Sequence, residues 1–182
     1  MEVREKYIAR LLNDPAAHGY SEIKFVHTPQ IVVSRWVRQR CQYLCRATRQ
    51  SDLCPPFSPT ADDTLKMLDE YKFGLLLRQE VPLAAMADHG EAWRTFEQAL
   101  VESENEAFIR GYGKAFSIGA GNCLFGHHDD RARPCDFTGK TRPTLESIGV
   151  NLHDTLDMVG WEHHLVRDPD DPFQFFGLLL LE

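Results

Sequence analysis

The sequence predicts an α/β protein, more narrowly an α+β sandwich in which helices pack against a mixed β-sheet and two long loops carry the cysteine residues. Three observations predict this class. Amphipathic stretches of helical period alternate with short apolar runs, the cysteine-bearing segments fall between these elements, and no repeat, low-complexity tract or linker divides the 182 residues. We therefore expect residues 1–182 to form a single domain, long enough to bury roughly two thirds of the surface of the unfolded chain.

The first part of the chain is expected to contain a helix and two strands. Residues 2–12 place apolar side chains at helical spacing and end at a segment with proline and glycine, which predicts an N-terminal helix. The runs 22–28 and 30–37 are rich in β-branched and aromatic residues, and Pro29 separates them. We expect two short strands here that lead into the first cysteine loop.

The middle of the chain predicts two more helices and two more strands. Residues 58–71 begin like a helix, with Thr60 as a cap and an aspartate three residues later. Residues 72–80 form a continuous apolar run typical of a buried strand, residues 91–110 form an amphipathic helix, and residues 114–120 form a second strand. This order predicts a βαβ unit, for which a right-handed parallel connection is strongly preferred.

The last part of the chain holds the second cysteine loop, which we expect over residues 119–142. Helical signals follow over residues 143–158, where a glycine interrupts them. The runs 161–166 and 173–181 have the pattern of two paired strands, so we expect a C-terminal hairpin.

Charge and composition exclude some classes of partner. The formal net charge is −7 and the basic residues form no long stripe, so nucleic acid is not an expected partner. The apolar C-terminal run is too short to span a bilayer, and neither end carries a secretory or lipidation signal, so we expect no membrane association. We expect a cytoplasmic protein, in which clustered thiols stay reduced and indicate metal binding or catalysis more often than disulfides.

Three of the five cysteine residues lie close together in the sequence. Cys41, Cys45 and Cys54 have the spacing C-x3-C-x8-C, and two prolines come directly after the third. The spacing differs from the C-x2-C knuckle of most structural zinc sites, whereas proline after a ligand cysteine is familiar from iron–sulfur loops. The alternative is that these are small buried core residues, but polar neighbours such as Gln42 and Asp52 disfavour it. The pattern therefore predicts metal ligands.

Basic residues surround the first thiols: Arg35, Arg38, Arg40, Arg46 and Arg49. Positive charge lowers the pKa of a nearby thiol and suits thiolate ligands, so we expect these side chains to favour metal binding. The alternative is a solvated basic face of a helix or loop.

Five segments of the chain resemble those of a known protein family: "RWVRQRCQYLC", "LCPPFSPT", "DEYKFGLLLRQE", "GYGKAFSIGAGNC" and "RPTLESIGV". The family is that of the cysteine-rich, predicted metal-binding proteins of domain of unknown function 2284, and the resemblance runs from about Tyr20 to the C-terminus. Members usually carry C-x2-C-x2-C-x5-C in the second loop, which would place thiols at positions 123, 126, 129 and 135. This chain keeps Cys123 and Cys135 but has Gly126 and Asp129.

The resemblance implies a metal site with fewer thiolates than is usual in the family. Five cysteines suffice for one four-thiolate centre, most simply Cys41, Cys45 and Cys54 with either Cys123 or Cys135 as the fourth ligand. Tetrahedral sulfur ligation serves zinc and iron–sulfur clusters alike. We expect a [4Fe-4S] cluster rather than zinc, for three reasons: the C-x2-C pair is absent, two prolines follow the third cysteine, and the chain resembles this family.

Two classes of function fit such a centre. A cluster with one iron open to a substrate would carry out redox or Lewis-acid chemistry on a small molecule, with a redox partner where electrons are transferred. The alternative is a zinc-stabilised module without catalysis that binds another molecule or serves as a partner subunit or scaffold.

The histidines offer a third alternative. His127, His128 and Asp129 lie in the loop where two family-typical thiols are missing, so nitrogen and oxygen ligands could replace sulfur and hold a mononuclear metal. Asp129 is the strongest of these, because it occupies a position of a family thiol. For His163 and His164, we expect hydrogen-bonded core side chains rather than ligands.

Overall fold

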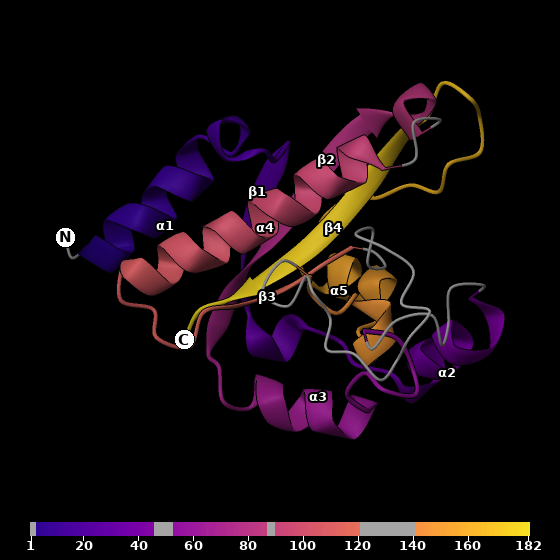
Figure 1. The fold of residues 1–182 in the computed structure, drawn as a ribbon, viewed down its shortest axis with the longest axis horizontal. Helices are drawn as coiled ribbons and strands as arrows, with labels where there is room; N and C mark the ends of the chain where they lie inside the picture. The colour runs from indigo at the N-terminus through magenta and orange to yellow at the C-terminus, as the bar shows by residue number, and fades with distance from the viewer. Residues whose placement is uncertain (1–2, 46–52, 87–89, 121–140) are drawn as a thin grey trace, which may run out of the picture.

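The computed structural model describes residues 3–45, 53–86, 90–120 and 141–182 (Figure 1). These residues form helices α1 (Val3–Asn13), α2 (Arg35–Leu44), α3 (Ala61–Leu68), α4 (Glu91–Ile109) and α5 (Leu152–Met158), and strands β1 (Glu22–His27), β2 (Phe73–Pro82), β3 (Phe116–Ile118) and β4 (Pro172–Leu180). Short 3-10 helices lie at η1 (Ala16–His18), η2 (Thr28–Gln30), η3 (Leu83–Met86) and η4 (Glu146–Ile148). None of the helices in these ranges is long and apolar enough to cross a membrane.

The four strands form one sheet in the order β1-β2-β4-β3, and each neighbouring pair is antiparallel. The α/β class is confirmed, but the pairings between the described strands are all antiparallel, so the expectation of a mixed sheet is wrong for these strands. β2 and β3, the two strands of the predicted βαβ unit, do point the same way, because each is antiparallel to β4, which lies between them. Beyond the strands, a parallel bridge joins Gly119 to Thr144.

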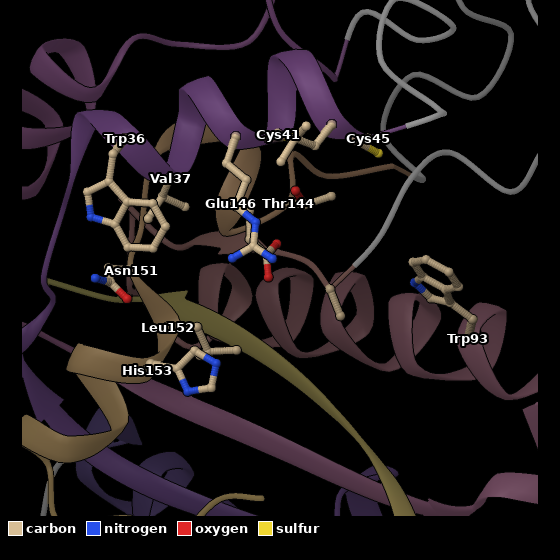
Figure 2. Close-up of a pocket in the computed structure, with 13 residues that line it drawn as sticks. Trp36, Val37, Cys41, Cys45, Trp93, Thr144, Glu146, Asn151, Leu152 and His153 are labelled. Atoms are coloured by element: carbon tan, nitrogen blue, oxygen red, sulfur yellow. The ribbon is translucent and has the colours of Figure 1, made fainter. Parts of the chain in front are cut away.

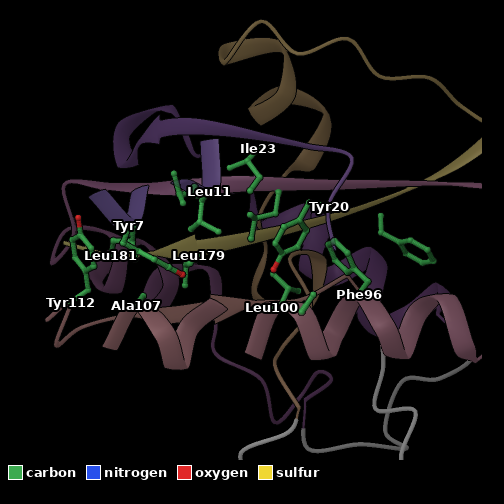
Figure 3. Close-up of a cluster of buried hydrophobic side chains, with 14 residues drawn as sticks. Tyr7, Leu11, Tyr20, Ile23, Phe96, Leu100, Ala107, Tyr112, Leu179 and Leu181 are labelled. Atoms are coloured by element: carbon green, nitrogen blue, oxygen red, sulfur yellow. The ribbon is translucent and has the colours of Figure 1, made fainter. Parts of the chain in front are cut away.

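Both faces of the sheet are covered. Figure 1 shows α1 and α4 on one face and α3 and α5 on the other. Leu75 and Leu77 of β2 belong to the core cluster that includes α1 and α4, drawn in Figure 3, whereas Leu76 between them belongs to the cluster that includes α3 and α5. Because side chains alternate along a strand, burial on both faces requires a continuous apolar run. This explains the sequence of residues 72–80.

The helix start predicted at Thr60 is confirmed. The backbone N–H of Asp63 donates to the Thr60 hydroxyl (3.2 Å), and the backbone N–H of Thr60 donates to the Asp63 carboxylate (3.2 Å). These reciprocal bonds satisfy two backbone donors that a helix start leaves without intrahelical partners.

The strand predicted over residues 30–37 is wrong. Val33 forms an isolated bridge to Val150, and α2 begins at Arg35. The β-branched run ends at Val33, and the following residues are mostly good helix formers such as arginine, glutamine and leucine. Cys41 therefore lies in a helix and Cys45 at its C-terminal end, instead of in a long loop.

The C-terminal hairpin is also wrong. Residues 161–166 form no strand, and β4 pairs with β2 along one edge and with β3 along the other. The guanidinium of Arg78 in β2 instead donates to the Glu162 carbonyl (3.0 Å), so a side chain holds this run in place of a strand ladder.

Glu104 of α4 joins Ser117 and Arg142, which lie before and after the part of the sequence that contains Cys123 and Cys135. Its carboxylate accepts hydrogen bonds from the backbone N–H and the hydroxyl of Ser117 (both 2.6 Å) and from Nε of Arg142 (2.8 Å). The side chains of Glu104 and Arg142 are only 15% and 11% exposed. Burial alone would raise the pKa of Glu104, but the bonds from Arg142 and Ser117 outweigh burial and hold the pKa below its ordinary value.

Glu104→Gln should lower the free energy of unfolding by about 1–3 kcal/mol, because an amide cannot accept all the bonds from Arg142 and Ser117. A lowered pKa in the folded state means that the carboxylate stabilises the fold above its ordinary pKa of 4.5 and loses this contribution as the pH falls through the folded value. Urea unfolding of both proteins between neutral and acidic pH should show the difference shrinking below pH 4.5. A difference that stays constant or grows on acidification would contradict this role.

Candidate metal centre

Cys41 and Cys45 share one face of α2. They are four residues apart, and residues four apart on an α-helix lie on the same side. The buried Val37 extends this row by one further turn, and the backbone N–H of Cys45 donates to the Cys41 carbonyl (3.3 Å). Both cysteines are half-buried. The C-x3-C spacing is therefore that of one helical turn.

Cys54 lies in a tight turn before α3 and is buried, with 1% of its surface exposed. The backbone N–H groups of Phe57 and Ser58 both donate to the Cys54 carbonyl (2.9 and 3.0 Å). The Ser58 hydroxyl donates to the carbonyl of Ser147 in η4 (2.7 Å). The turn is thus closed on itself and attached to η4.

Arg38 of α2 holds the turn against the helix. Its guanidinium donates to three backbone carbonyls, those of Pro56 (3.1 Å), Ser58 (2.9 Å) and Pro59 (2.9 Å). A planar guanidinium with several fixed donors suits such a task better than an ammonium group. Arg38 therefore brings Cys54 to the part of α2 that carries the other two thiols.

Cys45 and Cys54 lie near enough to Cys41 to affect its ionisation. The pKa of the Cys41 thiol is raised to about 12, mainly by burial and in smaller part by Cys45, Cys54 and Glu146, whereas Arg38 lowers it. The expectation that the surrounding arginines give a lowered thiol pKa is wrong for Cys41, because burial and the neighbouring acidic groups outweigh Arg38. A cation among the thiols would supply the missing positive charge.

The remaining arginines have different tasks. Arg35 forms an exposed ion pair with Asp62 (3.0 Å), and Arg40 lines a cavity beside the thiols. Arg46 and Arg49 lie outside the described residues.

This cavity has a volume of about 530 Å³ and opens next to the C-terminal half of α2 (Figure 2). Cys41 and Cys45 form part of its wall. Apolar side chains form most of the remainder: Trp36, Val37, Leu44, Trp93, Ala120 and Leu152. Such a mainly apolar cavity with a few polar groups is typical of small-molecule sites.

Glu146 contributes a carboxyl group to the same cavity. The side chain as a whole is exposed, because it opens into the cavity. Desolvation by the surrounding protein atoms raises the pKa of Glu146, and hydrogen bonds from its own backbone N–H and from Thr144 offset only part of the effect. A raised pKa and a nearby thiol are features of candidate functional carboxyls.

His153 lines the cavity from α5, in the part of Figure 2 away from α2. Its ring Nδ1 lies 2.7 Å from Nε2 of His163. His163 is half-buried and His164 exposed, so the prediction of core histidines is wrong in its burial, whereas both are hydrogen-bonded as expected.

The structure brings together three of the predicted ligands and leaves the others undescribed. Residues Cys123, Cys135, Asp129, His127 and His128 all lie within 121–140, outside the described residues. In the described ranges, no group of three His, Cys, Asp or Glu side chains has an arrangement that could hold a metal ion. Cys41, Cys45 and Cys54 are thus neighbours whose side chains would have to turn toward a common ion.

Sequence reasoning missed Glu146, His153 and the two indoles. Glu146 lies within "RPTLESIGV", a segment that carried the resemblance, but no motif marked it as a site residue. The helical spacing of Cys41 and Cys45 was a signal that sequence reasoning could have used.

One comparison with known proteins gave a match. A family model described as "Predicted metal-binding protein (DUF2284)" matches residues 24–181. No curated protein and no solved structure matches the chain.

Arg38→Ala should expose the Cys54 thiol, because the turn loses three bonds to a charged donor. Such bonds contribute about 1.5–3 kcal/mol each, so release of the turn should raise the rate of Cys54 alkylation roughly tenfold or more. The matched control is Arg35→Ala, which removes only an exposed ion pair and should leave the rate unchanged. Peptide mass spectrometry after timed alkylation with a chelator present gives the rate at each cysteine, and equal rates at Cys54 in both variants would rule out the clamp.

Proposed function

Because the chain belongs to the family of predicted metal-binding proteins DUF2284, we propose that it holds a sulfur-ligated metal centre between α2 and the turn before α3, with Cys41, Cys45 and Cys54 as ligands. The centre acts on a small molecule that occupies the adjoining cavity. The single observation that carries this proposal is the proximity of the three thiols, which reach one another from two separate elements and affect the ionisation of Cys41.

The set of donors fits a thiophilic metal. Thiolate is the ligand form of cysteine, and three thiols near one another ionise with difficulty unless a cation compensates their charge. The raised pKa of Cys41 is the expected property of such a cluster without its ion. Zinc, copper(I) and iron–sulfur clusters all prefer such soft ligands.

An iron–sulfur cluster agrees with the arrangement better than a structural zinc ion. The two cysteines of α2 are one helical turn apart, in contrast to the C-x2-C knuckle of most structural zinc sites, and Cys54 is followed directly by two prolines. We propose a [4Fe-4S] cluster, with Cys123 or Cys135 as the fourth ligand or with one iron left open.

A centre beside an open cavity suits chemistry on a bound molecule. Cys41 and Cys45 belong to the wall of the cavity, so a metal bound to them would lie at its edge. When bound, the centre would supply an electron or a Lewis acid there. The cavity's own residues would bind the molecule through the indoles of Trp36 and Trp93 and through the charge of Arg40.

Anaerobic purification of the full chain should distinguish the iron–sulfur proposal from the zinc-stabilised module. We expect a brown protein with iron and acid-labile sulfide in similar amounts. Colourless protein with one zinc per chain would support the non-catalytic module instead. Folded protein that binds neither metal after anaerobic reconstitution with iron and sulfide would contradict a metal centre of either kind.

Cys41→Ser and Cys54→Ser should each remove most of the bound metal, because each replaces a thiolate with a weak neutral ligand. His164→Ala is the matched control, because this side chain is exposed and is not a proposed ligand. Among the described residues, its ring forms a hydrogen bond to the Pro172 carbonyl (2.9 Å). Metal analysis of the three purified variants tests the assignment, and the same metal content in all of them would refute it. Circular dichroism should confirm that each variant is folded.

A further inference from the structure

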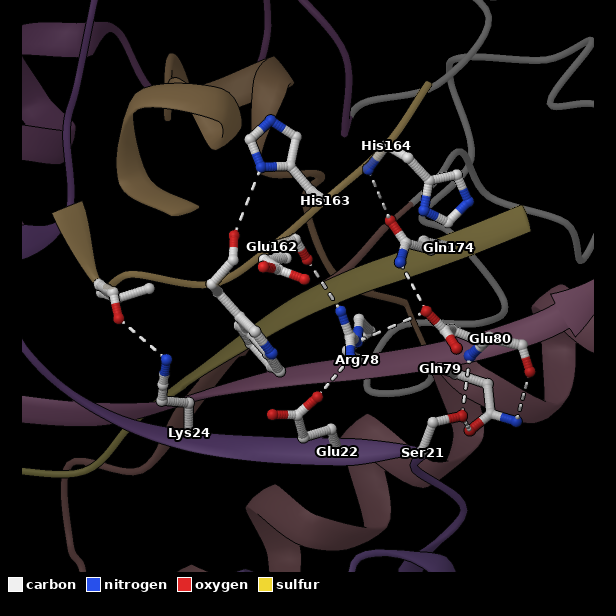
Figure 4. A network of polar contacts seen from close by, with 12 residues as sticks. Ser21, Glu22, Lys24, Arg78, Gln79, Glu80, Glu162, His163, His164 and Gln174 are labelled. Atoms are coloured by element: carbon white, nitrogen blue, oxygen red, sulfur yellow. Dashed lines mark hydrogen bonds and ion pairs between the residues drawn. The ribbon is translucent and has the colours of Figure 1, made fainter. Parts of the chain in front are cut away.

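Two histidines ten residues apart form a hydrogen-bonded pair at the edge of the cavity. Nδ1 of His153 lies 2.7 Å from Nε2 of His163, with the ring centres 4.7 Å apart. Nδ1 of His163 lies 3.4 Å from the carbonyl oxygen of Trp161, a contact drawn in Figure 4. The three groups thus form a chain that begins at a backbone carbonyl and ends at His153.

The chemistry of the carbonyl fixes where the protons lie. A carbonyl oxygen only accepts hydrogen bonds, so Nδ1 of His163 must be the donor in its hydrogen bond to the Trp161 carbonyl and must carry the proton. In a neutral ring the other nitrogen then accepts, so Nε2 of His163 receives a hydrogen bond from Nδ1–H of His153. It follows that Nε2 of neutral His153 has no proton and can accept one. A free histidine side chain in water prefers the opposite tautomer.

The segment that carries His163 is fixed to the sheet. Lys24 of β1 donates to the carbonyls of Val159 (2.9 Å) and Gly160 (3.1 Å), and Arg78 of β2 donates to the carbonyl of Glu162 (3.0 Å), as Figure 4 shows for Arg78. The Arg78 guanidinium also lies 5.0 Å from the centre of the Trp161 ring. His163 is therefore held by rigid neighbours and can orient the ring of His153.

Other polar groups in the cavity wall already have structural tasks. The Asn151 amide bonds to Asp154 at the start of α5 (2.6 Å), and the Thr144 hydroxyl accepts from the backbone N–H of Ser147 (3.0 Å). His153 differs from them, because none of the described residues forms a hydrogen bond with its Nε2. Together with Arg40 and Glu146, it is a polar group in the wall that a bound molecule could address.

We propose that His153 accepts the proton of an acidic hydroxyl group on an aromatic molecule bound in the cavity, and that His163 is the positioning residue that keeps Nε2 of His153 deprotonated. The indoles of Trp36 and Trp93 suit a planar ring, and the charge of Arg40 favours the oxyanion that proton transfer leaves. In the transfer the O–H bond breaks and an N–H bond forms at Nε2, with no other bond altered. This inference goes beyond the metal centre and requires none of the cysteines.

The tautomers test the relay directly. Two-bond ¹H–¹⁵N correlation spectra of the full chain, at a pH where both rings are neutral, should show Nδ1–H for both His153 and His163. In His163→Ala, His153 should return to the Nε2–H form, whereas His164→Ala should leave it unchanged. An Nε2–H form of His153 in the wild-type protein would overturn the relay, as would a His163→Ala variant in which His153 keeps the Nδ1–H form.

Phenol is a probe for the proposed class of ligand, since it combines one aromatic ring with one acidic hydroxyl. Phenol should shift the His153 Nε2 resonance saturably, without shifting that of His164, and benzene should not shift Nε2 in the same way. His163→Ala should weaken phenol binding about two- to tenfold, the range for one hydrogen bond. Absence of a saturable shift at His153 up to the solubility limit of phenol would overturn the ligand class.

The outcome is separable from that of the metal proposal. Metal content should be the same in His163→Ala as in the wild type, because neither histidine is a proposed ligand. A chain without metal can still show the tautomers and bind phenol, and a chain with a cluster can fail both tests.

Discussion

The three bonds from the Arg38 guanidinium to the carbonyls of residues 56, 58 and 59 are the constraint on which the candidate centre depends. Helix geometry alone brings Cys41 and Cys45 together, since they are one turn apart. Cys54 lies ten residues after Leu44, the last residue of α2, and reaches this face because its turn is fastened to Arg38. A single side chain of α2 thus joins the local pair of thiols to the distant one.

The 3-10 helix η4 is hydrogen-bonded both to the start of α2 and to the turn that carries Cys54. The backbone N–H of Ser34 donates to the Gly149 carbonyl (2.8 Å), and that of Asn151 donates to the Val32 carbonyl (2.7 Å), so the start of α2 is attached directly to the end of η4. Ser58 attaches the cysteine turn to the same element. Because Glu146 belongs to η4, these bonds also set the carboxyl group beside the thiols. The proposed metal ligands and the cavity therefore share one framework. Through Ile148, this framework packs against the core cluster that includes α3 and α5.

The sequence predicted the elements whose signals are local. The continuous apolar run of β2 and the cap at Thr60 depend on residues within one element, so the pattern alone was sufficient. Insertion of β4 between β2 and β3 depends on pairing with residues 90 to 106 positions away in the chain, from Pro82 with Pro172 to Gly74 with Leu180, which no local pattern encodes. For the same reason the hairpin was wrong, since it assumed that adjacent runs pair.

The site was predicted in part for similar reasons. Thiol identity and clustering indicated Cys41, Cys45 and Cys54, and the second and third of these lie near enough to Cys41 to affect its ionisation, although the described residues form no ready metal site. The raised pKa of Cys41 depends on burial, which only the packed structure shows. Of the arginines that were expected to lower it, the three that the structure describes act mainly as a clamp, an ion pair and a cavity wall. The pair of His153 and His163 arises from the path of the chain after α5, and no motif spacing indicates it.

X-ray absorption at the metal edge tests the central claim most directly, because it counts the atoms that bind the metal. For the anaerobically purified protein, we expect at least three sulfur ligands per metal at about 2.3 Å. Cys45→Ser should lose sulfur scattering or the metal itself. A metal surrounded only by nitrogen and oxygen atoms, with scattering unchanged in Cys45→Ser, would contradict the convergence of these thiols on one centre.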